Sequence, residues 1–168
     1  MTRTTLADAV GLDVDRLTAV VRRLVAAGQT IAVAESLTAG LITATLTTVP
    51  GASAVVRGGL VVYATDLKHA IAGVDADLLA RVGAVHPEVA RQLAGGVRTV
   101  CDAAWGVGVT GVAGPDPQDG QPVGTVFTCL DTGSGTLDSA DLFTGDREAI
   151  RAATVRRVVH LIEQALDR

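Results

Sequence analysis

Hydrophobic residues recur at two different spacings along the chain, and the two spacings alternate. In residues 13–28 they fall three or four positions apart, the spacing of an amphipathic helix, and Gly28 is a natural end for that helix. Residues 31–35 are instead a short, almost continuous apolar run, which predicts a buried strand. The alternation predicts strands at 31–35, 54–63, 104–110, 123–131 and 136–143, and helices at 13–28, 38–48, 65–73, 75–82, 87–102 and 147–166.

This order of elements predicts the fold class. Helices alternate with strands until a late hairpin whose turn spans 131–135, so we expect an α/β fold, a three-layer α/β/α sandwich. Its sheet should be mixed, parallel in part and antiparallel at the end. Gly58 and Gly59 predict a bend or bulge in the second strand. With no linker, low-complexity tract or internal repeat, residues 1–168 are expected to form a single domain.

Composition narrows the class of protein. The chain has 168 residues, 48% of them hydrophobic and 19% charged, and a mean hydropathy of +0.40, which is typical of a globular domain. No apolar run approaches the ~20 residues needed to cross a bilayer. Acidic residues stand near the start, where a signal peptide would be apolar. We therefore expect a cytoplasmic protein without a membrane partner.

Charge and residue types argue against two further classes of partner. The formal net charge is −4, no basic run exceeds two residues, and one Trp, one Tyr and two Phe are the only aromatic residues. A nucleic-acid surface of basic and stacking side chains is therefore not expected. The three histidines and two cysteines show no metal-ligand spacing, so we expect no metal, no cofactor and two reduced core cysteines. Apolar helical faces favour a homo-oligomer.

Polar residues gather where the predicted strands end. Ligands bind beyond the carboxyl ends of strands in open α/β sheets, so these clusters are the places to look for chemistry. The four clusters are residues 35–38, 63–68, 110–114 and 145–147.

Ser36 has two interpretations. It follows a strand and precedes a helix, so its hydroxyl could cap that helix by accepting a backbone N–H bond. It could equally be a nucleophile, with the backbone N–H groups at the start of the 38–48 helix stabilising an oxyanion. A base would then be needed. Lys68 is the only lysine among 14 basic residues, and a desolvated lysine, unlike an arginine, can lose its proton. Tyr63 could hold Lys68 or relay a proton.

Two further features could bind an anion. Residues 109–116, VTGVAGPD, are rich in glycine and stand at the end of a strand, so their backbone N–H groups could cradle an anion, although such a segment is more often an ordinary turn. Arg147 begins a helix, where a positive charge is unfavourable. It therefore predicts an anionic partner, which could be Asp146, Glu148 or a bound phosphate.

Taken together, five segments resemble the CinA C-terminal domain family, which includes stand-alone nicotinamide mononucleotide deamidases. The segments are AESLTAG, GGLVVYATDLKHAIAGV, GAVHPEVARQLA, GVTGVAGPD with QPVGTVF, and FTGDREAIR. They occur in the family's order from about residue 15 to residue 166, and residues 1–12 fall outside the pattern as an N-terminal extension.

The resemblance implies an amidohydrolase that converts nicotinamide mononucleotide to nicotinate mononucleotide and ammonia. By position, it implies catalytic roles for Ser36, Lys68 and Tyr63. It assigns the mononucleotide substrate to Glu35, Thr38, Gly40, Thr110, Gly111, Ala113, Gly114 and Arg147. The phosphate and ribose are expected at the 110–115 loop and Arg147.

The chain departs from the family pattern at three places. Ala39 stands where the family usually has glycine, Asp66 where asparagine is frequent, and residues 116–121, DPQDGQ, replace a glycine-rich filler expected to be a surface loop. Because of the Ala39 departure, a domain that binds a mononucleotide without hydrolysing it remains an alternative function. A structural or partner protein of the competence and damage-inducible context is a third reading.

Overall fold

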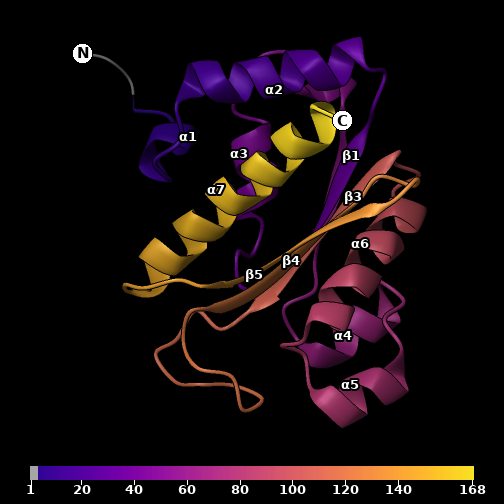
Figure 1. Cartoon of the computed structure of the whole chain (residues 1–168), viewed down its shortest axis with the longest axis vertical. Helices are drawn as coiled ribbons and strands as arrows, with labels where there is room; N and C mark the ends of the chain where they lie inside the picture. Colours follow the sequence, from indigo (N-terminus) through magenta and orange to yellow (C-terminus); the bar gives the residue numbers. More distant parts are fainter. Residues whose placement is uncertain (1–3) are drawn as a thin grey trace.

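The computed structural model describes residues 4–168 as one sheet between two layers of helices (Figure 1). The strands are β1 (Ile31–Glu35), β2 (Val56–Val61), β3 (Trp105–Gly111), β4 (Thr125–Asp131) and β5 (Thr136–Leu142). The helices are α1 (Leu6–Ala9), α2 (Val14–Ala26), α3 (Leu41–Leu46), α4 (Thr65–Ala70), α5 (Ala76–Val82), α6 (Pro87–Val100) and α7 (Arg147–Leu166), with a 3₁₀ turn at Ala52–Ala54.

The sheet has the strand order β2-β1-β3-β4-β5. Strands β2, β1 and β3 are parallel, whereas β4 and β5 run antiparallel to their neighbours. The carboxyl ends of the three parallel strands therefore meet at one edge of the sheet. The register of β1 against β2 shifts at Arg57, directly before Gly58, as the glycine pair predicts. The expected three-layer sandwich with a mixed sheet is confirmed.

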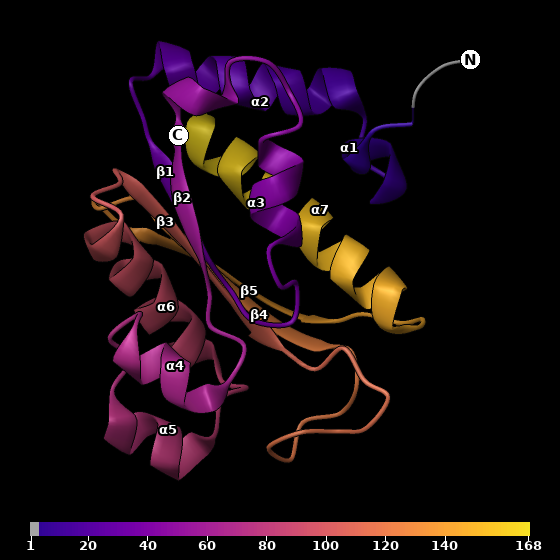
Figure 2. The same cartoon turned by 180° about the vertical axis from the view of Figure 1, so that it is seen from behind.

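Alternate side chains of the sheet point to opposite faces and pack into two separate hydrophobic cores. Val33 and Val107 pack with the helices α2, α3 and α7, while Ala32 and Ala34 pack on the opposite face beneath α6. Figure 2 shows the first group of helices on one side of the sheet and α4, α5 and α6 on the other. Burial on both faces explains why β1 reads as a continuous apolar run instead of an alternating one.

Most element boundaries differ from the prediction by one to three residues, and two of the differences have clear local reasons. Helix α3 begins at Leu41, not at residue 38, because Ala39 and Gly40 adopt positive φ angles of 50° and 95° that interrupt a helix. Strand β2 is shorter than the predicted 54–63, since its amino-terminal end forms the 3₁₀ turn. The first difference lies beside Ser36, whereas the second lies at the opposite end of the sheet from the predicted site.

The N-terminal extension is partly built into the core. Ala7, Val10 and Leu12 are buried against the helices of the first layer, and the Val10 carbonyl accepts a 2.6 Å hydrogen bond from Arg156 Nη1. Residues 1–3 of the predicted extension lie outside the described residues. Within residues 4–168, no helix has both the length and the apolar character required to cross a membrane.

Candidate active site

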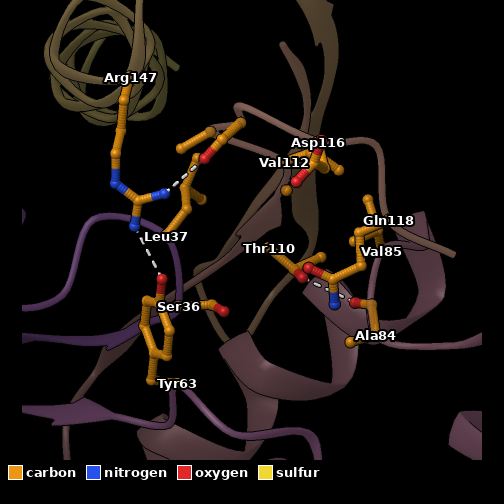
Figure 3. A pocket seen from close by; sticks show the side chains of 13 residues that line it. Ser36, Leu37, Tyr63, Ala84, Val85, Thr110, Val112, Asp116, Gln118 and Arg147 are labelled. Atoms are coloured by element: carbon orange, nitrogen blue, oxygen red, sulfur yellow. Dashed lines mark hydrogen bonds between the residues drawn. The ribbon is translucent and has the colours of Figure 1, made fainter. Parts of the chain in front are cut away.

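Four predicted clusters meet at the carboxyl edge of the parallel strands and enclose a cavity (Figure 3). Ser36 follows β1, Tyr63 follows β2, the 110–114 segment ends β3, and Arg147 is the first residue of α7. The cavity is lined by Ser36, Leu37, Tyr63, Ala84, Val85, Thr110, Gly111, Val112, Ala113, Gly114, Asp116, Gln118 and Arg147.

Ser36 does not cap helix α3. The preceding residue, Glu35, does so instead: its carboxylate accepts hydrogen bonds from the backbone N–H groups of Gly40, Ile42 and Thr43 at 2.8–3.1 Å, and a further bond from the Thr43 hydroxyl. Glu35 is only 1% exposed. A carboxylate that accepts several N–H bonds at a helix start is a strong cap. The Ser36 hydroxyl is thereby left free to face the cavity.

The same contacts correct the prediction of which N–H groups could stabilise an oxyanion. The N–H groups at the start of α3 were predicted to stabilise an oxyanion, but those of Gly40, Ile42 and Thr43 are occupied by Glu35. The N–H of Leu37 lies nearer to Ser36 along the chain, and no described residue accepts a hydrogen bond from it. Because Leu37 lines the cavity, its amide is an available donor.

Lys68 lies beneath Ser36 and is almost completely buried, with 1% of its surface exposed. Its Nζ lies 3.2 Å from Ser36 Oγ. Burial disfavours the ammonium form and lowers the pKa of Lys68 to about 8, although Asp119 and Asp66 partly oppose that shift through their negative charges. A lysine with this pKa is neutral in about a tenth of the molecules at pH 7 and in about half of them at pH 8.

Two backbone carbonyls orient the Lys68 amino group. Nζ donates to the carbonyls of Val62 at 2.9 Å and Tyr63 at 3.2 Å, and its third direction is toward Ser36. In the neutral amine the two N–H bonds can remain on the carbonyls, so the lone pair faces the Ser36 hydroxyl. This is the arrangement a general base requires to take the serine proton.

The Tyr63 hydroxyl is not bonded to Lys68. The predicted contact that holds Lys68 is made by the Tyr63 carbonyl, while the hydroxyl accepts a 2.8 Å hydrogen bond from Arg147 Nη2 (Figure 3). The ring is 55% exposed. The predicted relay of a proton from the Tyr63 hydroxyl directly to Lys68 is therefore wrong, because the hydroxyl is bonded to Arg147.

Arg147 does not pair with either neighbouring carboxylate in the described part of the chain. Asp146 caps helix α7, and Glu148 pairs with Arg151. Arg147 Nη1 instead donates 2.7 Å to the Gly114 carbonyl, which joins the start of α7 to the loop after β3. Its guanidinium charge thus stays uncompensated by these two acids and borders the cavity, as expected for an anion-binding arginine.

The 110–114 segment contributes mainly backbone to the cavity. The Thr110 hydroxyl donates 2.7 Å to the Ala84 carbonyl and so joins β3 to the segment before α6. The N–H groups of Ala113 and Gly114 have no acceptor among the described residues. Together with Arg147 they form a positively polarised corner that could hold an anion. No three His, Cys, Asp or Glu side chains of residues 4–168 gather in a group that could hold a metal ion.

Three predicted substrate contacts do not line the cavity. Glu35 is the helix cap described above, and Gly40 is one of the residues it caps. Thr38 is fully buried, and its carbonyl accepts a 3.0 Å hydrogen bond from Arg151 Nη2. The structure gives these residues a role in building the turn after Ser36. Their predicted contact with substrate is not supported.

The sequence interpretation missed six cavity residues that lie outside its strand-end clusters or were left unassigned there. They are Leu37, Ala84, Val85, Val112, Asp116 and Gln118. Asp116 and Gln118 belong to the stretch predicted to be a surface loop. The Asp119-Gly120 pair within it is a hairpin signal that could have indicated an ordered turn.

Comparison with known proteins agrees with this architecture. The CinA C-terminal domain family matches residues 15–166. A CinA-like protein of Anaeromyxobacter sp. (strain Fw109-5) is 47% identical over 150 residues, which are 88% of this chain and 36% of the relative. A putative competence-damage inducible protein of Desulforamulus reducens is 44% identical over 144 residues, 86% of this chain and 35% of the relative. The chain thus spans about a third of the length of these curated relatives.

Solved structures of the CinA superfamily match this fold over almost their whole length. The competence/damage inducible protein CihA of Agrobacterium tumefaciens superposes with a TM-score of 0.86 at 34% identity, covering 92% of this chain and 94% of the other. A CinA superfamily protein of Klebsiella pneumoniae gives a TM-score of 0.87 at 30% identity, covering 91% and 96%. By sequence and by fold, this chain belongs to the CinA C-terminal domain family.

Proposed function

We propose that this domain is an amidohydrolase that removes ammonia from the carboxamide of a mononucleotide, with nicotinamide mononucleotide as its substrate. The single observation that carries the proposal is the pair formed by Ser36 and the buried Lys68, whose Nζ and Oγ atoms are 3.2 Å apart. The arrangement supports covalent catalysis by an activated hydroxyl.

In the proposed reaction, Ser36 Oγ attacks the carboxamide carbon while neutral Lys68 takes the hydroxyl proton. The resulting oxyanion is stabilised by the Leu37 amide. Lys68 returns the proton to the leaving nitrogen, the C–N bond breaks, and ammonia departs from an acyl ester on Ser36. Lys68 then takes a proton from water, which attacks the ester and releases the carboxylate, and the serine hydroxyl is restored.

The charge distribution supports a phosphorylated substrate. Arg147 and the N–H groups of Ala113 and Gly114 are the positively polarised groups of the cavity, whereas Lys68 does not line it and its Nζ is bonded to Ser36, Val62 and Tyr63. A phosphate held by Arg147 and these amides would not need a direct contact with Lys68, a contact that would raise the pKa of Lys68. Arg147 suits this task because a planar guanidinium presents a fork of N–H donors that matches phosphate oxygens.

The test is ammonia release from nicotinamide mononucleotide by the purified protein. The wild type and a Ser53→Ala variant, which removes an exposed serine hydroxyl of the 3₁₀ turn, should both release ammonia. Ser36→Ala should release none above background, because a nucleophile is lost and the expected fall in rate is at least about a thousandfold. Equal rates for Ser36→Ala and wild type would exclude the proposed nucleophile.

A mononucleotide-binding domain without turnover is the second candidate, and Ala39 is the observation that favours it. Ala39 holds a φ of 50° in the turn that directly follows Ser36 and Leu37, at a place where the family resemblance predicts glycine. A displaced Leu37 amide would weaken oxyanion binding. Binding of the mononucleotide by calorimetry, without ammonia release by the wild type, would identify this second function.

A further inference from the structure

The 116–121 stretch is an ordered hairpin and not a loose surface loop. Gln118 and Gln121 exchange two backbone hydrogen bonds, of 3.1 Å and 2.8 Å. The two residues between them, Asp119 and Gly120, have φ angles of +53° and +73°. Positive φ at both central positions is the mark of a type I′ turn, for which Asp-Gly is a preferred pair. The backbone of this turn, and with it the points from which the side chains of residues 118–121 leave the main chain, is therefore fixed.

Asp119 joins the hairpin to the segment that lines the cavity before α6. Its Oδ2 accepts hydrogen bonds from the backbone N–H groups of Ala84 at 2.6 Å and Val85 at 3.2 Å. A side chain at Gly83 would collide with the Asp119 carboxylate, so the glycine permits the close approach. The Ala84 carbonyl is bonded in turn to Thr110. The hairpin is thus tied to the segment before α6 and, through it, to the end of β3.

The fastened hairpin and the residues before it place two polar side chains at the cavity. Asp116 and Gln118 line it, and neither side chain makes a hydrogen bond or an ion pair with a described residue. Figure 3 shows both on the side of the cavity away from Arg147. A phosphate would be repelled by the Asp116 carboxylate, so this side of the cavity suits an uncharged group with hydroxyls.

We propose that Asp116 and Gln118 form a ribose subsite that binds the vicinal 2′- and 3′-hydroxyls of the substrate. A carboxylate accepts hydrogen bonds from hydroxyls, and a carboxamide can both donate and accept, so the pair matches a vicinal diol. A carboxylate performs this task for the ribose of dinucleotides in other α/β proteins. The ligand's identity rests on the proposed function, whereas the residues assigned to the diol rest on the geometry of the hairpin.

The experiment measures binding without turnover. In a Ser36→Ala background, calorimetry compares nicotinamide mononucleotide with its 2′,3′-dideoxy analogue. The unaltered subsite should bind the mononucleotide about tenfold or more tightly, the usual effect of hydrogen bonds to one side chain. Gln118→Ala and Asp116→Asn should each weaken mononucleotide binding about tenfold and leave the affinity for the analogue within about twofold.

A matched control comes from the same hairpin. Gln121→Ala removes a carboxamide that does not line the cavity, and it should preserve the preference for the hydroxylated ligand. Equal affinities for both ligands, binding of neither, or equal loss of both affinities in the two variants would overturn the ribose subsite. Failure of the proposed function is a separate result, since it appears as absent ammonia release by the wild type whatever the two affinities are.

Discussion

Ala39 shows how much local strain one side chain beside the nucleophile introduces. Its φ of 50° lies in the left-handed region, where a Cβ crowds the following carbonyl at a cost of about 1–2 kcal/mol. Gly40 follows with a φ of 95°, which a glycine adopts without that cost. The strained residue lies between Ser36 and the start of α3, so the turn that presents the nucleophile is itself under strain.

Replacing Ala39 with glycine should relieve this strain. Ala39→Gly is expected to increase the free energy of unfolding by about 1 kcal/mol, because the relief exceeds the entropy that glycine adds to the unfolded chain. Urea denaturation of both proteins measures the difference. A loss of stability in Ala39→Gly would show that the alanine side chain makes a contact worth more than the strain.

At the scale of the element, Glu35 determines where helix α3 begins. The carboxylate occupies three backbone N–H groups and one hydroxyl, so the first turn of a six-residue helix is held by a residue of the preceding strand. Ser36 and Leu37 lie between the capping residue and the helix it caps. The cap therefore fixes the short span that carries the nucleophile and the Leu37 amide.

Loss of the cap should lower the stability of the folded protein. Glu35→Gln places an amide NH₂ where only acceptors are wanted, and we expect it to lower the free energy of unfolding by about 2–4 kcal/mol. Thr43→Val removes one of the four bonds and should cost about 1 kcal/mol. Thermal or urea unfolding measures both. A Glu35→Gln variant as stable as wild type, but unable to bind the mononucleotide, would restore Glu35 to the substrate contacts.

At the scale of the whole molecule, close packing of α6 on β3 positions one wall of the cavity. Gly106 and Gly108 face α6, where a Cβ on either would collide with the backbone of Ala94 or Ala90. The segment that leads into α6 carries Ala84 and Val85, which line the cavity. The separation of helix and sheet is thus set by glycines and bears directly on the site.

Filling this contact should shift the helix. Gly108→Ala is expected to lower the free energy of unfolding by about 3 kcal/mol, because the colliding atoms belong to the backbone and only movement of α6 can make room. The matched control is Gly135→Ala, at a turn position with open space, which should stay within about 0.5 kcal/mol of wild type. Equal urea midpoints for the two variants would contradict the packing account.

The parts of the site that the sequence predicted are those fixed by short-range patterns. Ser36 and Tyr63 follow apolar runs and Thr110 lies near the end of one. Parallel strands bring their carboxyl ends to one edge, so these residues and Lys68, on the short helix after β2, could be placed together. The solitary lysine supplied the candidate base. Nothing in composition or spacing identified which backbone carbonyls would orient it, because Val62 and Tyr63 act through their main chain.

The parts that were missed depend on contacts between distant segments. Asp119 reaches Ala84 across 35 positions of the chain, so the hairpin looked like an exposed loop. Helix α3 was predicted to start at residue 38, whereas positive φ angles at Ala39 and Gly40 delay it to Leu41, a turn held by hydrogen bonds to Glu35 that the sequence pattern did not reveal. Periodicity indicates which face of an element is buried, but it does not reveal which side chain accepts which backbone N–H.

The central claim is that neutral Lys68 takes the proton of Ser36, and the most direct measurement is kcat/KM for ammonia release from nicotinamide mononucleotide as a function of pH. Because burial lowers the pKa of Lys68 to about 8, the charged form prevails below that pH and the active neutral form above it. The substrate phosphate titrates near pH 6, outside this window. We predict that kcat/KM rises through a single ionisation near pH 8 to a plateau, and that Lys68→Met has no activity at any pH. A flat profile across pH 8, or release of ammonia by Lys68→Met, would contradict the account.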